Sequence, residues 1–255
     1  MILFRSLIFN IIFYINTVIF VLISVPAFVL TKRSMVRVAQ WWGSTNLVLL
    51  RLICNMKFEL RGRENIPPGG CLVASKHQSA WETFALFPVF EFPAVVLKRE
   101  LTWIPLFGWG LIKAGMIALD RDAGKEAMKG LIDKTRATLA ANRQVIVFPE
   151  GTRRPPGAPP DYKLGVVQLY SNCNVACVPV ALNSGMFWQR RGFMRYPGTV
   201  VIEILPPIPA GMPRAAFYRR LQDDIEAASQ RLIAEAERER ALMQRAAQAP
   251  QLKDL

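Results

Sequence analysis

A run of 24 residues without a charged side chain, Leu7 to Leu30, is the feature that most limits how this chain of 255 residues can fold. A helix crosses the core of a bilayer with about 20 apolar residues, so the run is long enough to span one. A secretory signal has a shorter apolar region, of about 7–15 residues, and ends in a small-x-small site. This run ends instead in Phe28, Val29 and Leu30. We therefore expect a retained membrane anchor.

Basic residues set the orientation of the anchor. Arg5 precedes the run, whereas Lys32, Arg33 and Arg37 follow it, and this excess is expected to keep the following domain on the cytoplasmic side of the inner membrane. The formal net charge of +13 also favours an anionic partner. Next to an apolar anchor that partner is expected to be an anionic lipid surface. A nucleic acid would explain the charge but not the anchor, and we find no basic–aromatic motif for one.

A second apolar stretch, Trp41 to Cys54, is short and is interrupted by Arg51. We expect it to be a helix in the membrane interface, where tryptophan is favoured. Asn16 and Pro26 weaken the first run as a clean span. Two arrangements therefore stay open for residues 1–54: a transmembrane helix, or a shallow interfacial hairpin.

The pattern changes at residue 55, where short apolar runs begin to alternate with helical periodicity. The runs are rich in β-branched residues, which is typical of buried strands, and such alternation predicts an α/β domain with a largely parallel sheet. We expect a single domain over residues 55–240, with a mixed, largely parallel sheet flanked by helices, and a polar tail over 241–255. The expected strands are 56–60, 71–75, 94–97, 116–119, 145–148, 178–182 and 199–205, and the expected helices are 123–142, 163–171 and 217–236.

The one histidine of the chain, His77, follows a predicted strand and lies five residues before Glu82. An imidazole oriented by a carboxylate is the minimum for general base catalysis. On one helix the two side chains would be about 140° apart. They can meet if His77 lies in the turn and Glu82 in the first helical turn, which Ser79 suits as an N-cap. The alternative is that Glu82 only caps its helix.

A second candidate site follows the predicted strand 145–148. Gly151 allows a turn with positive φ that presents backbone N–H groups to an anion. Thr152 adds a hydroxyl, and Arg153 a guanidinium that suits phosphate oxygens. Two further strand ends are basic, at Lys98 and Arg121. Ligands of α/β proteins bind at the carboxyl ends of strands, so these residues form one site only if their strands are adjacent.

Together these residues resemble the 1-acylglycerol-3-phosphate acyltransferases of the glycerolipid acyltransferase superfamily. The similarity covers about residues 55–208, and Glu82 stands where the family usually has aspartate. Four blocks carry it in family order: His77-Gln78-Ser79-Ala80-Trp81-Glu82; Lys98-Arg99-Glu100-Leu101 with Gly115 through Asp120-Arg121; Phe148-Pro149-Glu150-Gly151-Thr152-Arg153; and Val178-Pro179-Val180-Ala181-Leu182.

The resemblance implies a glycerol-3-phosphate acyltransferase-like fold and acyl transfer from a thioester to the sn-2 hydroxyl of lysophosphatidic acid. His77 would be the general base and Glu82 its orienting acid. The residues that would bind the phosphate and glycerol are Lys98, Arg121, Glu150, Gly151, Thr152 and Arg153. The family needs no metal and no cofactor. The acyl donor, a thioester of coenzyme A or of acyl carrier protein, is a co-substrate.

Three alternatives stay open on the residues alone. The acceptor can be another lyso-lipid, such as a lyso-ornithine lipid or another lysophospholipid. A non-catalytic, membrane-anchored anion-binding protein would have His77 and Glu82 far apart or buried away from any pocket. A serine hydrolase is disfavoured because we find no G-x-S-x-G elbow.

Overall fold

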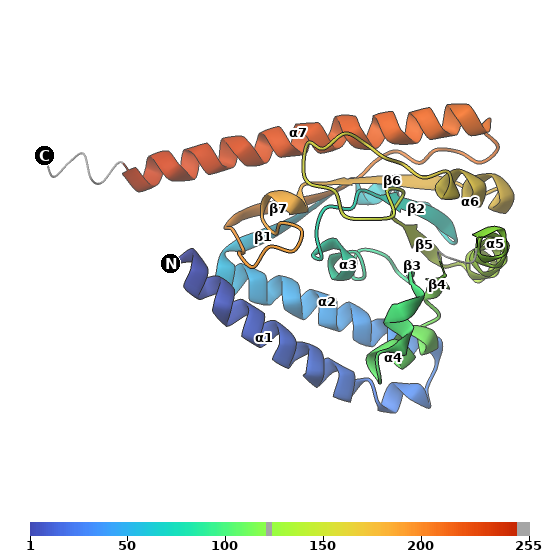
Figure 1. Cartoon of the computed structure of the whole chain (residues 1–255), viewed down its shortest axis with the longest axis horizontal. Coiled ribbons are helices and arrows are strands. Elements are labelled where there is room, and N and C mark those ends of the chain that lie inside the picture. The colour runs from blue at the N-terminus through green and yellow to red at the C-terminus, as the bar shows by residue number, and fades with distance from the viewer. Residues whose placement is uncertain (121–123, 249–255) are drawn as a thin grey trace, which may run out of the picture.

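The computed structural model in Figure 1 describes residues 1–120 and 124–248. Its centre is a seven-stranded sheet in the order β1-β7-β6-β2-β5-β3-β4, in which only the β6–β7 pairing is antiparallel among the described strands. The mixed, largely parallel sheet predicted from the sequence is therefore confirmed. The strands are β1 (Met56–Arg61), β2 (Cys71–Ser75), β3 (Ala94–Lys98), β4 (Ile117–Leu119), β5 (Gln144–Val147), β6 (Cys177–Leu182) and β7 (Gly198–Ile204).

Helices cover both faces of this sheet. One face carries α5 (Gly124–Ala140), α6 (Gly165–Cys173) and α7 (Arg214–Gln248), and the other carries α1 (Ile2–Ile23), α2 (Lys32–Cys54), α3 (Glu82–Ala85) and α4 (Phe107–Lys113). Two hydrophobic cores result, one on each side of the sheet. The central strand β2 shows why: Val73 packs into one core and Leu72 and Ala74 into the other, because successive side chains of a strand point to opposite faces.

The C-terminal helix is longer than its apolar periodicity indicates. The apolar positions end at Ala236, which is buried, but α7 continues through the polar residues after it to Gln248. Part of this extension is held by the domain, since both carboxylate oxygens of Glu239 accept hydrogen bonds from Thr199. The polar segment after residue 241 therefore begins as helix rather than as an irregular tail.

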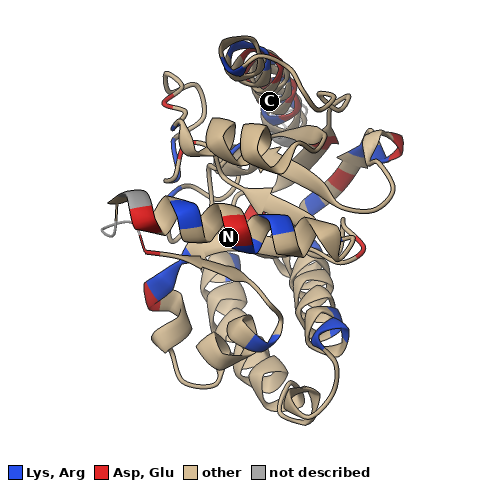
Figure 2. Cartoon of the chain, turned by 90° about the vertical axis from the view of Figure 1, so that its right-hand side faces the viewer, with Lys and Arg blue, Asp and Glu red and all other residues tan. Residues whose placement is uncertain are grey.

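The two N-terminal helices form a hairpin that packs against the domain (Figure 1). Their polar side chains face inward: Asn16 donates to Asn46 of α2 over 3.3 Å, and Asn10 accepts from Arg195 over 2.9 Å. The outward face of α1 is apolar and exposed, with Ile11 and Ile15 both about half accessible. Figure 2 shows these lower helices mostly without charge. A soluble protein does not usually leave so large an apolar face in water.

Among the described residues, α1 alone has the length and apolar composition needed to cross a membrane. Its contacts with the domain bear on the two arrangements that the sequence left open. Phe9 packs edge-on against Trp188, and Arg195 donates to Asn10, so the N-terminal half of α1 is attached to the domain. Of the two, the hairpin fits these contacts better than a helix that leaves the domain to cross a bilayer.

Candidate active site

The predicted site residues lie at one edge of the sheet. Strands β2, β5 and β3 are neighbours and run parallel, so their carboxyl ends share that edge. His77 follows β2, the segment Phe148–Arg154 follows β5, and Lys98 ends β3. The sequence therefore located the strand ends correctly, and the sheet order brings them together. Arg121 lies outside the described residues.

His77 and Glu82 are in direct contact. The Nδ1 atom of His77 lies 2.8 Å from Oε1 of Glu82. The backbone N–H groups of Gln78 and Ser79 donate to the same oxygen, each over 2.7 Å. Glu82 is fully buried, whereas His77 keeps 12% of its side chain exposed. The carboxylate is thus fixed in the interior and the imidazole reaches the surface of the site.

This arrangement determines the tautomer of His77. Oxygen Oε1 already accepts two N–H groups, and an ionised carboxylate is an acceptor only. Nδ1 therefore carries the hydrogen and donates it to Glu82. Nε2 is left with its lone pair, which is the state that a general base needs.

The short loop between β2 and α3 produces this contact. Helix α3 begins at Glu82, so His77 lies outside it, as the spacing predicted. Glu82 does reach back to the N–H of Ser79, which is one half of the expected capping box. The hydroxyl of Ser79, however, accepts from the N–H of Trp81 at 3.1 Å rather than from Glu82. The same carboxylate caps the turn and orients the imidazole, so the two readings of Glu82 are compatible.

The segment after β5 packs directly on His77. The ring of Phe148 stacks on the imidazole with centroids 4.0 Å apart and an interplanar angle of 20°. The N–H of Arg154 donates to the carbonyl of His77 over 2.8 Å. Gly151 has φ +64°, a conformation that glycine adopts without strain. The segment after β5 and the histidine turn are therefore in direct contact.

The side chains of this segment point in different directions. Glu150 is almost fully buried and pairs with Lys76 over 3.0 Å. Burial raises the pKa of the Glu150 carboxyl, and the charge of Lys76 opposes that rise. Thr152 is exposed and Arg153 is partly exposed, so both are accessible to a ligand. Lys98 is also exposed and lies 3.7 Å from Glu100.

Sequence reasoning missed several residues that the fold brings to this edge. Ser184 follows β6 and its hydroxyl donates to Oε2 of Glu82 over 2.7 Å. The N–H of Gly185 donates to Gln78 over 3.0 Å. Arg190 donates to the carbonyl of Arg153 over 2.9 Å. No local pattern marks these residues, because their partners are distant in the sequence. Ser184 and Gly185 lie about 100 residues after the histidine motif, and Arg190 lies 37 residues after Arg153.

The chemistry available here is proton abstraction near a cationic surface. The two serines closest to the dyad are engaged, since Ser184 donates to Glu82 and Ser79 accepts from Trp81. Neither hydroxyl is hydrogen-bonded to His77. Within residues 1–120 and 124–248, no group of three or more His, Cys, Asp or Glu side chains is placed to hold a metal ion.

Comparison with known proteins gives consistent results. A family model described as "Acyltransferase" matches residues 57–183. The 1-acyl-sn-glycerol-3-phosphate acyltransferase of Pseudomonas aeruginosa is 40% identical over 173 residues, which are 68% of this chain and 67% of that protein. The human 1-acyl-sn-glycerol-3-phosphate acyltransferase alpha is 29% identical over 166 residues, which are 64% of this chain but only 59% of the human protein.

A solved structure has the same fold. The crystal structure of the 1-acyl-sn-glycerophosphate acyltransferase PlsC from Thermotoga maritima superimposes with a TM-score of 0.76. The match covers 91% of this chain and 98% of that chain at 20% sequence identity. That coverage is too high to leave out both α1 and α2, so the match includes at least part of the N-terminal hairpin.

Proposed function

The chain belongs to the acyltransferase family, and on that premise we propose that it transfers a fatty acyl group from a thioester to the sn-2 hydroxyl of 1-acyl-sn-glycerol-3-phosphate, giving phosphatidic acid. The observation that carries the proposal is the contact of 2.8 Å between His77 and the buried Glu82. That contact leaves Nε2 of His77 free at the surface of a cationic site. The names of the relatives support the choice of acceptor.

The reaction needs one proton to move twice. Nε2 of His77 accepts the proton of the acceptor's hydroxyl as the hydroxyl oxygen attacks the thioester carbonyl. Glu82 stabilises the imidazolium that forms, as the acid of a Ser-His-Asp triad does. The carbon–sulfur bond then breaks, the ester remains on the glycerol, and the departing thiolate takes the proton from His77. The acceptor hydroxyl replaces the serine of a triad.

The phosphate of the acceptor would be bound by the segment that follows β5. Thr152 offers a hydroxyl donor and Arg153 a guanidinium, on a turn that the positive φ of Gly151 permits. The N–H of Gly151 itself donates to the carbonyl of Phe148 over 2.9 Å. Lys98 adds a cation from the neighbouring strand. The hydrogen bond from Arg154 to the carbonyl of His77 fixes the distance between this segment and the base. Arg190 brings a further guanidinium to the carbonyl of Arg153.

The membrane arrangement suits a substrate whose tail stays in the bilayer. We place the exposed apolar face of α1 in the cytoplasmic leaflet, with the domain on the cytoplasmic side. Lys32, Arg33 and Arg37 at the start of α2 would contact anionic headgroups. The acyl donor is a thioester of coenzyme A or of acyl carrier protein, and His77 would serve either.

The test is an acyl transfer assay with the purified chain in anionic vesicles. Lysophosphatidic acid is offered with acyl-coenzyme A or acyl carrier protein, and the product is identified by mass spectrometry. We expect phosphatidic acid from the wild type and at least ~100-fold less from His77→Ala, the usual scale for loss of a general base. Transfer to a lyso-ornithine lipid in preference to lysophosphatidic acid would overturn the acceptor. The absence of transfer to any lyso-lipid would favour a non-catalytic anion-binding protein.

A further inference from the structure

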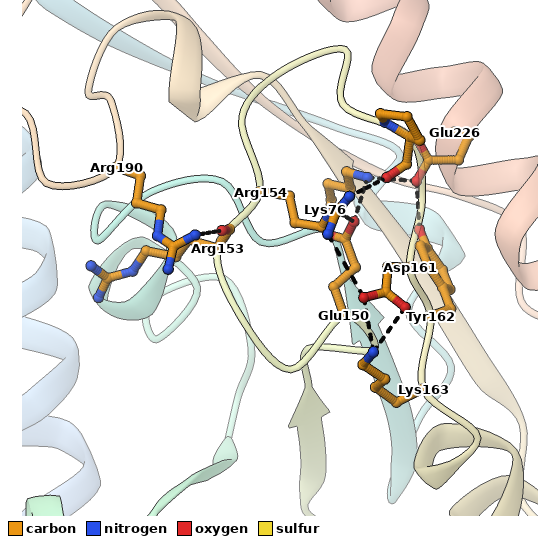
Figure 3. A network of polar contacts seen from close by, with 10 residues as sticks. Lys76, Glu150, Arg153, Arg154, Asp161, Tyr162, Lys163, Arg190 and Glu226 are labelled. Carbon is orange, nitrogen blue, oxygen red and sulfur yellow. Dashed lines mark hydrogen bonds and ion pairs between the residues drawn. The ribbon is translucent and has the colours of Figure 1, made fainter.

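A buried charge cluster lies next to the dyad and takes no part in the proton transfer described above (Figure 3). Lys76 immediately precedes His77 and is 3% exposed. Its ammonium group donates to Glu150 over 3.0 Å and to Glu226 of α7 over 2.6 Å. The hydroxyl of Tyr162 donates to Glu226 over 3.0 Å. The cluster thus joins the end of β2, the anion-binding segment and the C-terminal helix.

Alternation along β2 explains why Lys76 and His77 point in opposite directions. The N–H of Lys76 donates to Val180, so the backbone pairing of β2 with β6 extends to this residue. Ala74 belongs to the core under α7, and Lys76, two residues on, faces the same side. His77 faces the other side, where it stacks on Phe148. One strand end therefore presents a base to the site and a cation to the interior.

Both residues hold the same segment of chain. His77 accepts the backbone N–H of Arg154 through its carbonyl, and Lys76 binds the side chain of Glu150. Glu150 and Arg154 bracket Gly151, Thr152 and Arg153, the part of the segment with ligand-facing donors. The glutamate of this motif is directed at Lys76 in the interior rather than at the ligand side, as its exposure of 1% shows.

The cluster is not explained as a contribution to stability alone. Taking charges out of water costs more than their attraction usually returns, so apolar residues of similar volume serve stability equally well. Lys76 is bound by two carboxylates, of which only Glu150 belongs to the segment. Glu226 comes from α7, and it supplies the second anchor that fixes the ammonium group.

We propose that Lys76 and Glu226 are positioning residues: through Glu150 they hold the segment Pro149–Arg154 at the place that the acceptor's phosphate requires relative to His77. The C-terminal helix is thereby part of the active-site framework. The proposal rests on the proposed function for the identity of the acceptor. Misplacement of a binding group by about 1 Å is known to cost on the order of 100-fold in rate.

The test compares Glu226→Gln with Glu235→Gln. Glu235 lies on the same helix and forms its own ion pair with Arg61 over 2.8 Å, but it has no contact with the cluster. We expect Glu226→Gln to raise the KM for lysophosphatidic acid about tenfold or more and to lower kcat, with the KM for the acyl donor changed less than twofold. Glu235→Gln should keep wild-type kinetics, and circular dichroism should show that both variants are folded at the assay temperature.

A second measurement asks whether the effect passes through Glu150. If it does, adding Glu226→Gln to Glu150→Gln should cost no more activity than Glu150→Gln alone, because residues that act through one another are not additive. Wild-type kinetics for folded Glu226→Gln, or equal increases in both KM values, would overturn the positioning role. If the wild type itself fails on lysophosphatidic acid, the proposed function fails instead. The same variants are then compared on whichever lyso-lipid it acylates.

Discussion

Replacing Glu82 by glutamine separates its two contributions, the orientation of His77 and the negative charge. Two backbone N–H groups, of Gln78 and Ser79, donate to Oε1, so the amide oxygen of the new side chain must occupy that position. The amide nitrogen then takes the place of Oε2 and donates to the hydroxyl of Ser184, which lies 2.7 Å away and can accept. Nδ1 of His77 still finds an oxygen, and its tautomer is kept.

The loss in Glu82→Gln is therefore the loss of charge alone. A hydrogen bond to a charged group contributes about 1.5–3 kcal/mol, whereas a neutral one contributes about 0.5–1.5 kcal/mol. The imidazolium in the transition state would lose a stabilisation of about 1–2 kcal/mol, which lowers kcat about 5- to 30-fold. Glu82→Ala removes the orientation too. We expect it to approach the ~10⁴-fold loss seen when a triad histidine is held in the wrong tautomer.

The assay is kcat at saturating acceptor and donor for wild type, Glu82→Gln and Glu82→Ala. Circular dichroism and thermal unfolding are measured in parallel, because Glu82 also caps the turn before α3. A glutamine variant as slow as the alanine variant would refute the assignment of Nδ1 as the donor. Two variants as fast as the wild type would refute the role of Glu82 in catalysis.

Three further results are expected from the same site and its anchor. Arg190→Ala should raise the KM for lysophosphatidic acid about 10- to 100-fold in steady-state assays if the Arg190 guanidinium binds the phosphate. The control is Arg191→Ala, at the neighbouring exposed residue, which should leave this KM unchanged. Exchanging Ile11 and Ile15 together for glutamine should weaken flotation with anionic vesicles. Each side chain is about half exposed and so gains about half of the ~1.5–3 kcal/mol of full burial when it enters the bilayer. Unchanged flotation would contradict the placement of α1. Because burial raises the pKa of Glu150 above its usual 4.5, the folded state binds more protons than the unfolded state between that pH and the raised pKa. Over that range this carboxyl makes the protein less stable as the pH rises. The free energy of unfolding, measured with urea, should therefore fall less with rising pH for Glu150→Gln than for the wild type. An identical pH dependence in both proteins would contradict this prediction.

The strands and the turn between His77 and Glu82 could be predicted from the sequence, because they depend on residues that are close together along the chain. Alternation and β-branched runs predicted the seven strands to within a few residues, since buried strands need apolar side chains on both faces. The five-residue spacing of His77 and Glu82 predicted a turn followed by a helix start, and α3 does begin at Glu82. The end of α7 could not be predicted from local periodicity, because Glu239 is held by Thr199, which belongs to a different element.

Which of these segments come together depends on the tertiary fold. Sheet order placed β5 beside β2 and so put Phe148 on His77. It also brought Ser184 to Glu82 and Glu226 to Lys76, across 102 and 150 residues of chain. Such pairings depend on strand adjacency and helix packing, which the residues near a motif do not encode. Local patterns in the chain were enough to predict the candidate groups and their turns. That these groups lie at one site follows from the fold, because contacts between distant segments are settled only by how the whole core packs.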